Sequence, residues 1–376
     1  MRPGDSIPLH DYSAKRIALI KPSSLGDIVH SLPVLTAIRR RYPKATIAWV
    51  INRDLEPLVR GHPDLDYTLP FDREACRAGL LPAATTYRRF FRKLRRENFD
   101  LAVDLQGLLR SGLMTAACRA RRRVGLSSAR EGAGWFYTDV VSVPQPSALH
   151  AVDRYWLIAR ALGVGDAHKR FHLPIAESDR HWAAQLLGDC PRPWLALAVG
   201  ARWETKRWPV DHFAALAHGA QSTFGGTVLF IGGPEEARLA QGVAMRLWGE
   251  VRDLTGQTTL GQLTALLSCA DVLVANDSGP LHLAAALGRP VVAPYTCTKI
   301  RLHGPYRAEE GAVEARIWCQ GSYLKHCQRL DCMSVLTSNH LWPNLHAILR
   351  RVKAEHSPSL HATDVIEVQP HGLKNG

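Results

Sequence analysis

Short apolar runs alternate with stretches of helical periodicity along most of the chain. Because strands that alternate with helices are typical of parallel sheets covered on both faces, this pattern predicts an α/β fold. The predicted strands are Ile17–Ile20, Thr46–Val50, Leu101–Asp104, Arg123–Gly125, Leu195–Val199, Thr227–Ile231, Val272–Ala275 and Pro290–Pro294.

The alternation stops between about residues 144 and 193. This stretch holds one helical pattern, at Ala151–Leu162, then a turn rich in Gly and His and the sequence "CPRP". A chain of 376 residues is also long for one hydrophobic core. We therefore predict an N-terminal Rossmann-like domain at 1–180 and a C-terminal one at 190–352, with ligands beyond the carboxyl ends of the strands. The polar, aperiodic residues 353–376 are predicted to be a disordered tail.

The formal net charge of +13 favours an anionic partner: nucleic acid, an acidic membrane surface or a phosphorylated small molecule. No run approaches the roughly 18 apolar residues that a membrane span needs. The first residues lack the apolar region of a signal peptide, so we expect a cytoplasmic location. The eight cysteines are scattered and are expected to be free thiols.

The first candidate site is the turn "KPSSLGD", which connects the predicted strand Ile17–Ile20 to a predicted helix. It matches neither a dinucleotide-binding nor a Walker loop. Asp27 at the mouth of a cleft can act as a general base, and Gly26 lets a substrate approach the backbone. The alternative is that Ser24 or Asp27 only caps the helix. Pro33 is expected to kink this helix or to mark a late start.

The second candidate site follows strands of the C-terminal half. "NDSGPLH" combines a tight turn, a helix cap and His282, and the exposed N–H groups of such a helix start can bind an anion. The cationic loop "ARWETKR" is a candidate phosphate clamp, and one of the two acids Glu235 and Glu236 after "IGGP" is a candidate ligand of ribose hydroxyls. Each feature also has a structural alternative. "NDSGPLH" can be the start of a well-capped helix, "ARWETKR" can be a solvated surface loop, and the acids can simply favour a helix N-terminus.

A basic amphipathic helix is predicted around residues 87–96. Its apolar residues are spaced i, i+3, i+4 and i+7, and six cations cover the rest. Such a helix can meet an anionic membrane or acceptor, or simply pack by its aromatic side chains. Further on, "WCQGSYLKHCQRLDCM" does not have the paired spacing of structural zinc sites, so free thiols and no metal are predicted.

Several motifs together resemble those of glycosyltransferase family 9, the ADP-heptose:lipopolysaccharide heptosyltransferases. They are "KPSSLGDIVHSLPVLTAIRRRYP", "DLQGLLRS", "HAVDRY", "KRWPVDHFAAL" and "NDSGPLHLAAALGRPVVAPY", in the family's order, and the resemblance covers residues 16 to about 350. It implies a GT-B fold, in which the first of two Rossmann-like domains binds the acceptor and the second the nucleotide-sugar. It also implies inverting transfer of a heptose from ADP-heptose without a metal or other cofactor.

The resemblance also assigns roles to residues. Asp27 matches the general base and Lys206 the lysine at the donor diphosphate. Partners would be the nucleotide-sugar, an anionic lipid-linked saccharide (Kdo-lipid A or heptosyl-Kdo-lipid A) and, peripherally, the inner leaflet, with no nucleic acid. The implied nucleotide-sugar residues are Arg202, Glu236, Asp277, Ser278, Gly279 and His282, and the implied acceptor residues are Ser24, Gly26, Arg92, Lys93, Gln106, Arg110 and Arg130.

Two alternatives stay open at this stage. One is another GT-B enzyme with a different nucleotide-sugar, such as another family-9 transferase or a sugar-nucleotide epimerase. The other is a basic nucleotide- or nucleic-acid-binding protein without catalysis, although no recognised nucleic-acid module is present.

Overall fold

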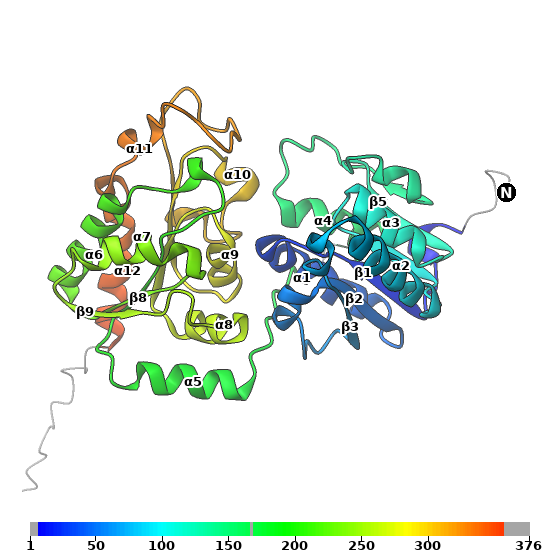
Figure 1. Cartoon of the computed structure of the whole chain (residues 1–376), viewed down its shortest axis with the longest axis horizontal. Helices are drawn as coiled ribbons and strands as arrows, with labels where there is room; N and C mark the ends of the chain where they lie inside the picture. The colour runs from blue at the N-terminus through cyan, green and yellow to red at the C-terminus, as the bar shows by residue number, and fades with distance from the viewer. Residues whose placement is uncertain (1–6, 166–167, 357–376) are drawn as a thin grey trace, which may run out of the picture.

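Two parallel six-stranded sheets form the two lobes of the molecule, as the computed structural model shows for residues 7–165 and 168–356 (Figure 1). The strand order is β3-β2-β1-β4-β5-β6 in the first sheet and β12-β11-β10-β7-β8-β9 in the second. Both orders reverse beside the first strand of their own half, which is the switch point at which doubly wound sheets bind ligands.

The first lobe holds the elements of the N-terminal half. Its strands are β1 Arg16–Ile20, β2 Thr46–Asn52, β3 Tyr67–Phe71, β4 Leu101–Asp104, β5 Arg122–Leu126 and β6 Asp139–Val141. Its helices are α1 Leu25–Arg41, α2 Leu80–Arg96, α3 Leu109–Ala117 and α4 Ala151–Ala161, with the 3-10 turns η1 Leu9–Asp11, η2 Arg53–Leu58, η3 Ala75–Ala78 and η4 Ala133–Phe136.

The second lobe follows α5 Glu177–Gly188, which belongs to the connection between the lobes and lies along the bottom of the second lobe in Figure 1. Its strands are β7 Trp194–Ala198, β8 Thr227–Phe230, β9 Glu250–Asp253, β10 Val272–Ala275, β11 Val291–Tyr295 and β12 Ala312–Glu314. Its helices are α6 Val210–Phe224, α7 Ala237–Ala244, α8 Leu260–Cys269, α9 Gly279–Ala286, α10 Ile300–His303, α11 Cys332–Val335 and α12 Ser338–His356, with the turns η5 Glu204–Lys206, η6 Pro234–Glu236 and η7 Glu309–Gly311.

All eight predicted strands are present, and the four that the pattern missed are the edge strands β3, β6, β9 and β12. Central strands of a parallel sheet are buried on both faces and are therefore continuous apolar runs, as in Ile17–Ile20. Edge strands are short and more polar. The strand β9 reads Glu-Val-Arg-Asp and is partly exposed throughout, so its sequence has no apolar run to detect.

Three local expectations meet different outcomes. The helix α1 begins at Leu25 and continues through Pro33, so the expected late start is wrong. The predicted tail begins inside α12, which runs to His356, and residues 357–376 lie outside the described residues. On α2, Phe90 and Leu94 are buried, and the Phe90 ring lies 5.0 Å from that of Phe71. The apolar face of α2 therefore packs on the sheet, as the alternative to membrane contact predicted.

Two further findings concern the membrane and the thiols. Among the described helices, none has the length and apolar character needed to cross a bilayer. All eight cysteines are free thiols, as predicted.

The two lobes touch directly where α1 meets α9. A Cβ added to Gly26 of α1 would lie 2.7 Å from the His282 ring, and one added to Gly279 would lie 3.0 Å from Leu25. Beside this contact, the His150 ring bonds the Gly304 carbonyl at 3.0 Å. The N-termini of the two helices therefore lie against each other, with Asp27 in the first turn of α1 and Asp277 just before α9.

Candidate functional site

Asp27 lies in the first turn of α1, and both of its carboxylate oxygens accept hydrogen bonds. The Ser24 amide and hydroxyl donate to Oδ2 at 3.2 and 2.8 Å, and the Tyr155 hydroxyl donates to Oδ1 at 3.0 Å. Lys21 Nζ is 3.6 Å from Oδ1. Asp27 therefore caps the helix, as one alternative predicted. Its side chain is still 37% exposed, so the carboxylate also remains accessible to a substrate.

The charges around Asp27 keep its carboxylate ionised. Burial by itself raises the pKa of Asp27, but the Lys21 cation and the two hydrogen bonds from Ser24 outweigh burial, so the pKa ends well below its usual range. Lys21 is fully buried, and its own pKa is raised because the attraction of Asp27 and Tyr155 outweighs burial. A base must be deprotonated before it can accept a proton, and Asp27 meets this requirement at any pH near neutrality.

In the second lobe, Asp277 binds the cation of Lys206. The Lys206 ammonium donates to Oδ2 at 2.5 Å, and the Thr298 hydroxyl donates to the same oxygen at 2.6 Å. His282 Nε2 lies 3.6 Å from Oδ1. Burial raises the pKa of Asp277, but His282 and Lys206 lower it well below its usual range. Asp277 therefore holds Lys206 in place beside the N-terminus of α9.

Glu236 lies across the carboxyl ends of β7 and β8. A Cβ on Gly200 would be 1.9 Å from its Oε1, and a Cβ on Gly232 would be 2.1 Å from its Oε2. The amide of Gly233 donates to Oε2 at 3.1 Å. Burial raises the pKa of Glu236, because the Gly233 bond compensates only in part. The two glycines therefore make room for this carboxylate at the switch point of the sheet.

Three buried histidines lie between the two lobes: His30 of α1, His150 before α4 and His282 of α9. The His30 ring centroid is 4.5 Å from that of His282 and 5.1 Å from that of His150. Burial and the two neighbouring histidines lower the pKa of His30 well below 6.5, so its ring is neutral. His30 Nε2, His282 Nδ1 and the Ser278 hydroxyl are buried without a hydrogen-bond partner, which leaves polar atoms available at the lobe contact.

The predicted acceptor residues do not all come together. Gln106 Oε1 accepts a long bond of 3.4 Å from the amide of Ser23, so it lies beside the turn that carries Asp27. Arg110 and Arg130 follow the carboxyl ends of β4 and β5, at the same edge of the sheet.

Arg92 and Lys93 lie elsewhere, because α2 runs back toward the amino edge. Arg92 is about 18 Å along the helix axis from Leu80, at 1.5 Å per residue. Both side chains are exposed and close to the start of β4, so the structure separates them from the other predicted acceptor residues.

Among the predicted donor residues, Lys206, Asp277, Ser278, Gly279 and His282 surround the N-terminus of α9, and Glu236 lies at the adjacent strand ends. Arg202 is exposed on the loop after β7.

Sequence reasoning missed Lys21, Tyr155, His30 and Thr298. A lysine that directly ends an apolar strand was a usable signal for Lys21, because an unpaired ammonium is rarely buried. Tyr155 ends the motif "HAVDRY", but nothing in that motif shows that its hydroxyl meets Asp27, 128 residues away.

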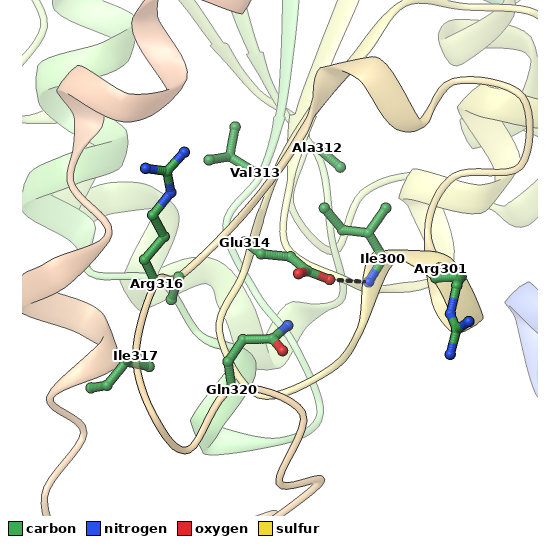
Figure 2. Close-up of a pocket in the computed structure, with 9 residues that line it drawn as sticks. Ile300, Arg301, Ala312, Val313, Glu314, Arg316, Ile317 and Gln320 are labelled. Carbon is green, nitrogen blue, oxygen red and sulfur yellow. Dashed lines mark hydrogen bonds between the residues drawn. The ribbon is translucent and has the colours of Figure 1, made fainter. Parts of the chain in front are cut away.

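An open pocket of about 620 Å³ lies along β12 and contains none of the predicted site residues (Figure 2). Glu314 points toward α10 there and accepts a hydrogen bond of 2.6 Å from the amide of Ile300. Within residues 7–165 and 168–356, no group of three or more His, Cys, Asp or Glu side chains is arranged to hold a metal ion. The contact between α1 and α9 is therefore the candidate active site.

Known proteins are similar to this chain over most of its length. The chain is similar to lipopolysaccharide heptosyltransferase 1 of Pseudomonas aeruginosa, with 30% identity over 83% of this chain and 87% of that protein. It is 25% identical to the lipopolysaccharide core heptosyltransferase OpsX of Haemophilus influenzae, over 80% of this chain and 83% of that protein. The solved structure of E. coli heptosyltransferase WaaC with ADP superposes with a TM-score of 0.69 at 25% identity, over 89% of this chain and 99% of that one.

The E. coli ADP-heptose LPS heptosyltransferase II structure superposes with a TM-score of 0.73 at 24% identity, over 90% of this chain and 99% of that one. Two facing parallel sheets with this superposition define the GT-B fold, as predicted. The family model described as glycosyltransferase family 9 (heptosyltransferase) matches residues 87–332. The chain belongs to this family. It is therefore a glycosyltransferase.

Proposed function

We propose that the enzyme transfers a heptose from ADP-heptose to the inner core of lipopolysaccharide by inverting displacement, without a metal. The observation that carries the proposal is the contact of the two helix N-termini. An ionised carboxylate from α1 and a lysine cation held at α9 lie on the two sides of one lobe contact. A displacement reaction needs these two charges on opposite sides of the sugar.

In the proposed step, Asp27 takes the proton of the acceptor hydroxyl while that oxygen bonds the anomeric carbon of the heptose. The bond from this carbon to the ADP oxygen breaks, and its electron pair leaves on the diphosphate. A positioned general base accelerates such a step by roughly 10²–10⁴-fold. Attack opposite the leaving group inverts the configuration at carbon.

The leaving diphosphate can be stabilised by groups of this chain. Lys206 supplies a full positive charge, and the amides at the N-terminus of α9 supply N–H donors and the helix dipole. Asp277 orients Lys206, and Glu236 is available to the ribose hydroxyls of ADP. This set of groups does the work that a divalent cation does in other transferases, and it supports the proposal of metal-independent transfer.

The relatives support the choice of substrates. The matched E. coli structures are named for ADP and for ADP-heptose, and the matched proteins include both heptosyltransferases 1 and 2. Kdo-lipid A and heptosyl-Kdo-lipid A are therefore the two acceptors to test.

The test begins with thermal stabilisation by ADP, UDP and GDP in the presence of EDTA. ADP at 100 times its dissociation constant should stabilise the protein by about 2.7 kcal/mol. Transfer from ADP-heptose is then measured with each acceptor, and the anomer of the product is determined by NMR. Stabilisation by UDP or GDP alone would reassign the donor, and a retained anomer or loss of activity in EDTA would refute the inverting or the metal-free mechanism.

The variant Asp27→Asn tests the assigned base. It should keep its ADP affinity and lose at least 10²-fold in kcat, because the amide cannot take the proton. Wild-type turnover by this variant would remove Asp27 from the role of base.

We also propose that the first lobe docks on the inner leaflet of the cytoplasmic membrane. Leu80, Leu81 and Trp135 are 91%, 82% and 89% exposed, and they follow the carboxyl ends of β3 and β5, beside the acceptor edge. Arg77, just before Leu80 in the chain, and Arg130, just before Trp135, are also exposed. Apolar side chains flanked by cations suit an anionic bilayer, and a lipid-linked acceptor has to be reached there.

Vesicle sedimentation tests this surface. Wild-type enzyme should bind phosphatidylglycerol vesicles better than phosphatidylcholine vesicles, and Trp135→Ser should weaken that binding several-fold. The control is Trp248→Ser, since Trp248 is 91% exposed on the second lobe. Equal losses in the two variants would contradict docking by the first lobe.

A further inference from the structure

A buried chain of hydrogen bonds lies behind Asp27. Lys21 directly follows β1, is 1% exposed, and donates to the Leu105 carbonyl at 3.2 Å and to the Tyr155 hydroxyl at 2.9 Å. An ammonium has only donors, so the Tyr155 oxygen must accept from Lys21. The single hydroxyl proton of Tyr155 then points to Asp27 Oδ1, 3.0 Å away.

The hydrogen bonds of Asp27 leave one direction free for a proton. Each carboxylate oxygen has two lone pairs. The two bonds from Ser24 occupy both lone pairs of Oδ2. On Oδ1, the Tyr155 hydroxyl occupies one, and Lys21 stays at 3.6 Å, beyond a hydrogen bond. The second lone pair of Oδ1 is the remaining acceptor.

We propose that Tyr155 is a positioning residue for the base: it orients Asp27 so that the free lone pair of Oδ1 receives the proton of the acceptor hydroxyl. The inference rests on the proposed function, in which Asp27 is the base. The proton moves from the acceptor hydroxyl to Oδ1, and Tyr155 keeps its own proton throughout. The role of Lys21 is to fix the direction in which the Tyr155 hydroxyl donates.

The helix packing supports a dedicated orientation. Tyr155 belongs to α4, which packs along α1, and its hydroxyl bonds Oδ1, the oxygen that the Ser24 cap leaves open. The carboxylate is thereby held through both oxygens, which restricts its rotation. Precise orientation of a base matters, because small displacements from the reactive geometry lower rates strongly.

The variant Tyr155→Phe tests the proposal, because it keeps the ring and removes only the hydroxyl. We expect kcat to fall about 10- to 100-fold, with the KM for the donor within twofold of wild type. The acid limb of the pH–kcat profile should also move to higher pH, since a hydrogen bond that favours the ionised carboxylate is lost. The charged and titratable groups that face Asp27 are Lys21 after β1, His30 of α1 and Tyr155 of α4, and across the lobe contact His282 of α9 lies against the adjacent Gly26.

The matched control is Tyr42→Phe. Tyr42 is buried at the other end of α1, and its hydroxyl donates to the Tyr12 carbonyl at 3.1 Å. Both variants remove one buried hydroxyl bond, so both should lower the thermal midpoint to a similar extent. Only Tyr155→Phe should change kcat and the acid limb. If its kcat and acid limb match those of Tyr42→Phe, Tyr155 has a structural role only and the proposal is overturned.

A measurement without turnover separates this inference from the proposed function. The ¹³C signal of the Asp27 carboxyl, assigned by its loss in Asp27→Asn, should titrate at higher pH in Tyr155→Phe than in wild type. If wild-type enzyme transfers no heptose and this shift is still observed, the proposed function fails while the coupling of Tyr155 to Asp27 holds. An unchanged titration would overturn the coupling itself.

Discussion

The variant Gly26→Ala should impair turnover without weakening the fold of the first lobe. The added Cβ would lie 2.7 Å from the His282 ring, and a contact that short requires displacement of one partner. The ring cannot easily yield, because His30 lies against it and Asp277 is 3.6 Å from its Nε2. Overpacking of this kind costs about 1–3 kcal/mol.

This cost falls on the contact between the lobes, so it should appear in kcat/KM. At 1.36 kcal/mol per tenfold, the loss is about 5- to 150-fold. Within the first lobe, alanine is the better helix former by about 0.5–1 kcal/mol, so the thermal midpoint should stay unchanged or rise.

The assay compares kcat/KM, ADP affinity and thermal midpoint with those of Gly188→Ala. Gly188 ends α5 and has no atom within 4 Å of its added Cβ, so this variant controls for the substitution itself. ADP affinity should be unchanged in Gly26→Ala, because the proposed nucleotide contacts lie on the second lobe. Wild-type kcat/KM in Gly26→Ala would show that turnover does not require the close contact of α1 and α9.

Three further predictions concern the second lobe and pH. In Gly200→Ala, the new Cβ displaces the Glu236 carboxylate. The dissociation constant for ADP, measured by calorimetry, should therefore rise about 10- to 150-fold, which corresponds to the loss of one hydrogen bond to a charged group. Unchanged affinity would exclude Glu236 from the nucleotide site. Asp277→Asn leaves the Lys206 cation without its charged partner and should lower the free energy of unfolding by roughly 3 kcal/mol or more in a denaturant titration, and a loss below 1 kcal/mol would contradict a tightly coupled pair. Burial lowers the pKa of His30, so the unfolded state binds a proton below about pH 6.5 that the folded state does not. Stability is therefore complete above that pH and falls as the pH is lowered, by up to about 1.4 kcal/mol per unit for each such histidine. His30→Gln should flatten this dependence, and an unchanged slope would refute a neutral His30.

Local chemistry explains how the sequence singled out most of the candidate site residues. At Asp27, Lys206 and Asp277 the signal was a strand end, a turn and a helix start within a few residues, and parallel strands bring such turns to one edge of their sheet. The central strands could also be predicted from the sequence, because burial on both faces requires continuous apolar runs. The sequence by itself therefore determined the fold class and the candidate residues of each lobe.

The tertiary structure decided which of these residues meet. It separates Arg92 and Lys93 from the acceptor edge, because α2 runs back along the sheet. It brings Tyr155 to Asp27 across 128 residues, because α4 packs along α1. It also reveals why position 26 is a glycine in this fold: His282 of the other lobe fills the space above it. Hydrophobic periodicity records which face of an element is buried, but not which distant element buries it. That partner is chosen by the packing of whole helices and sheets.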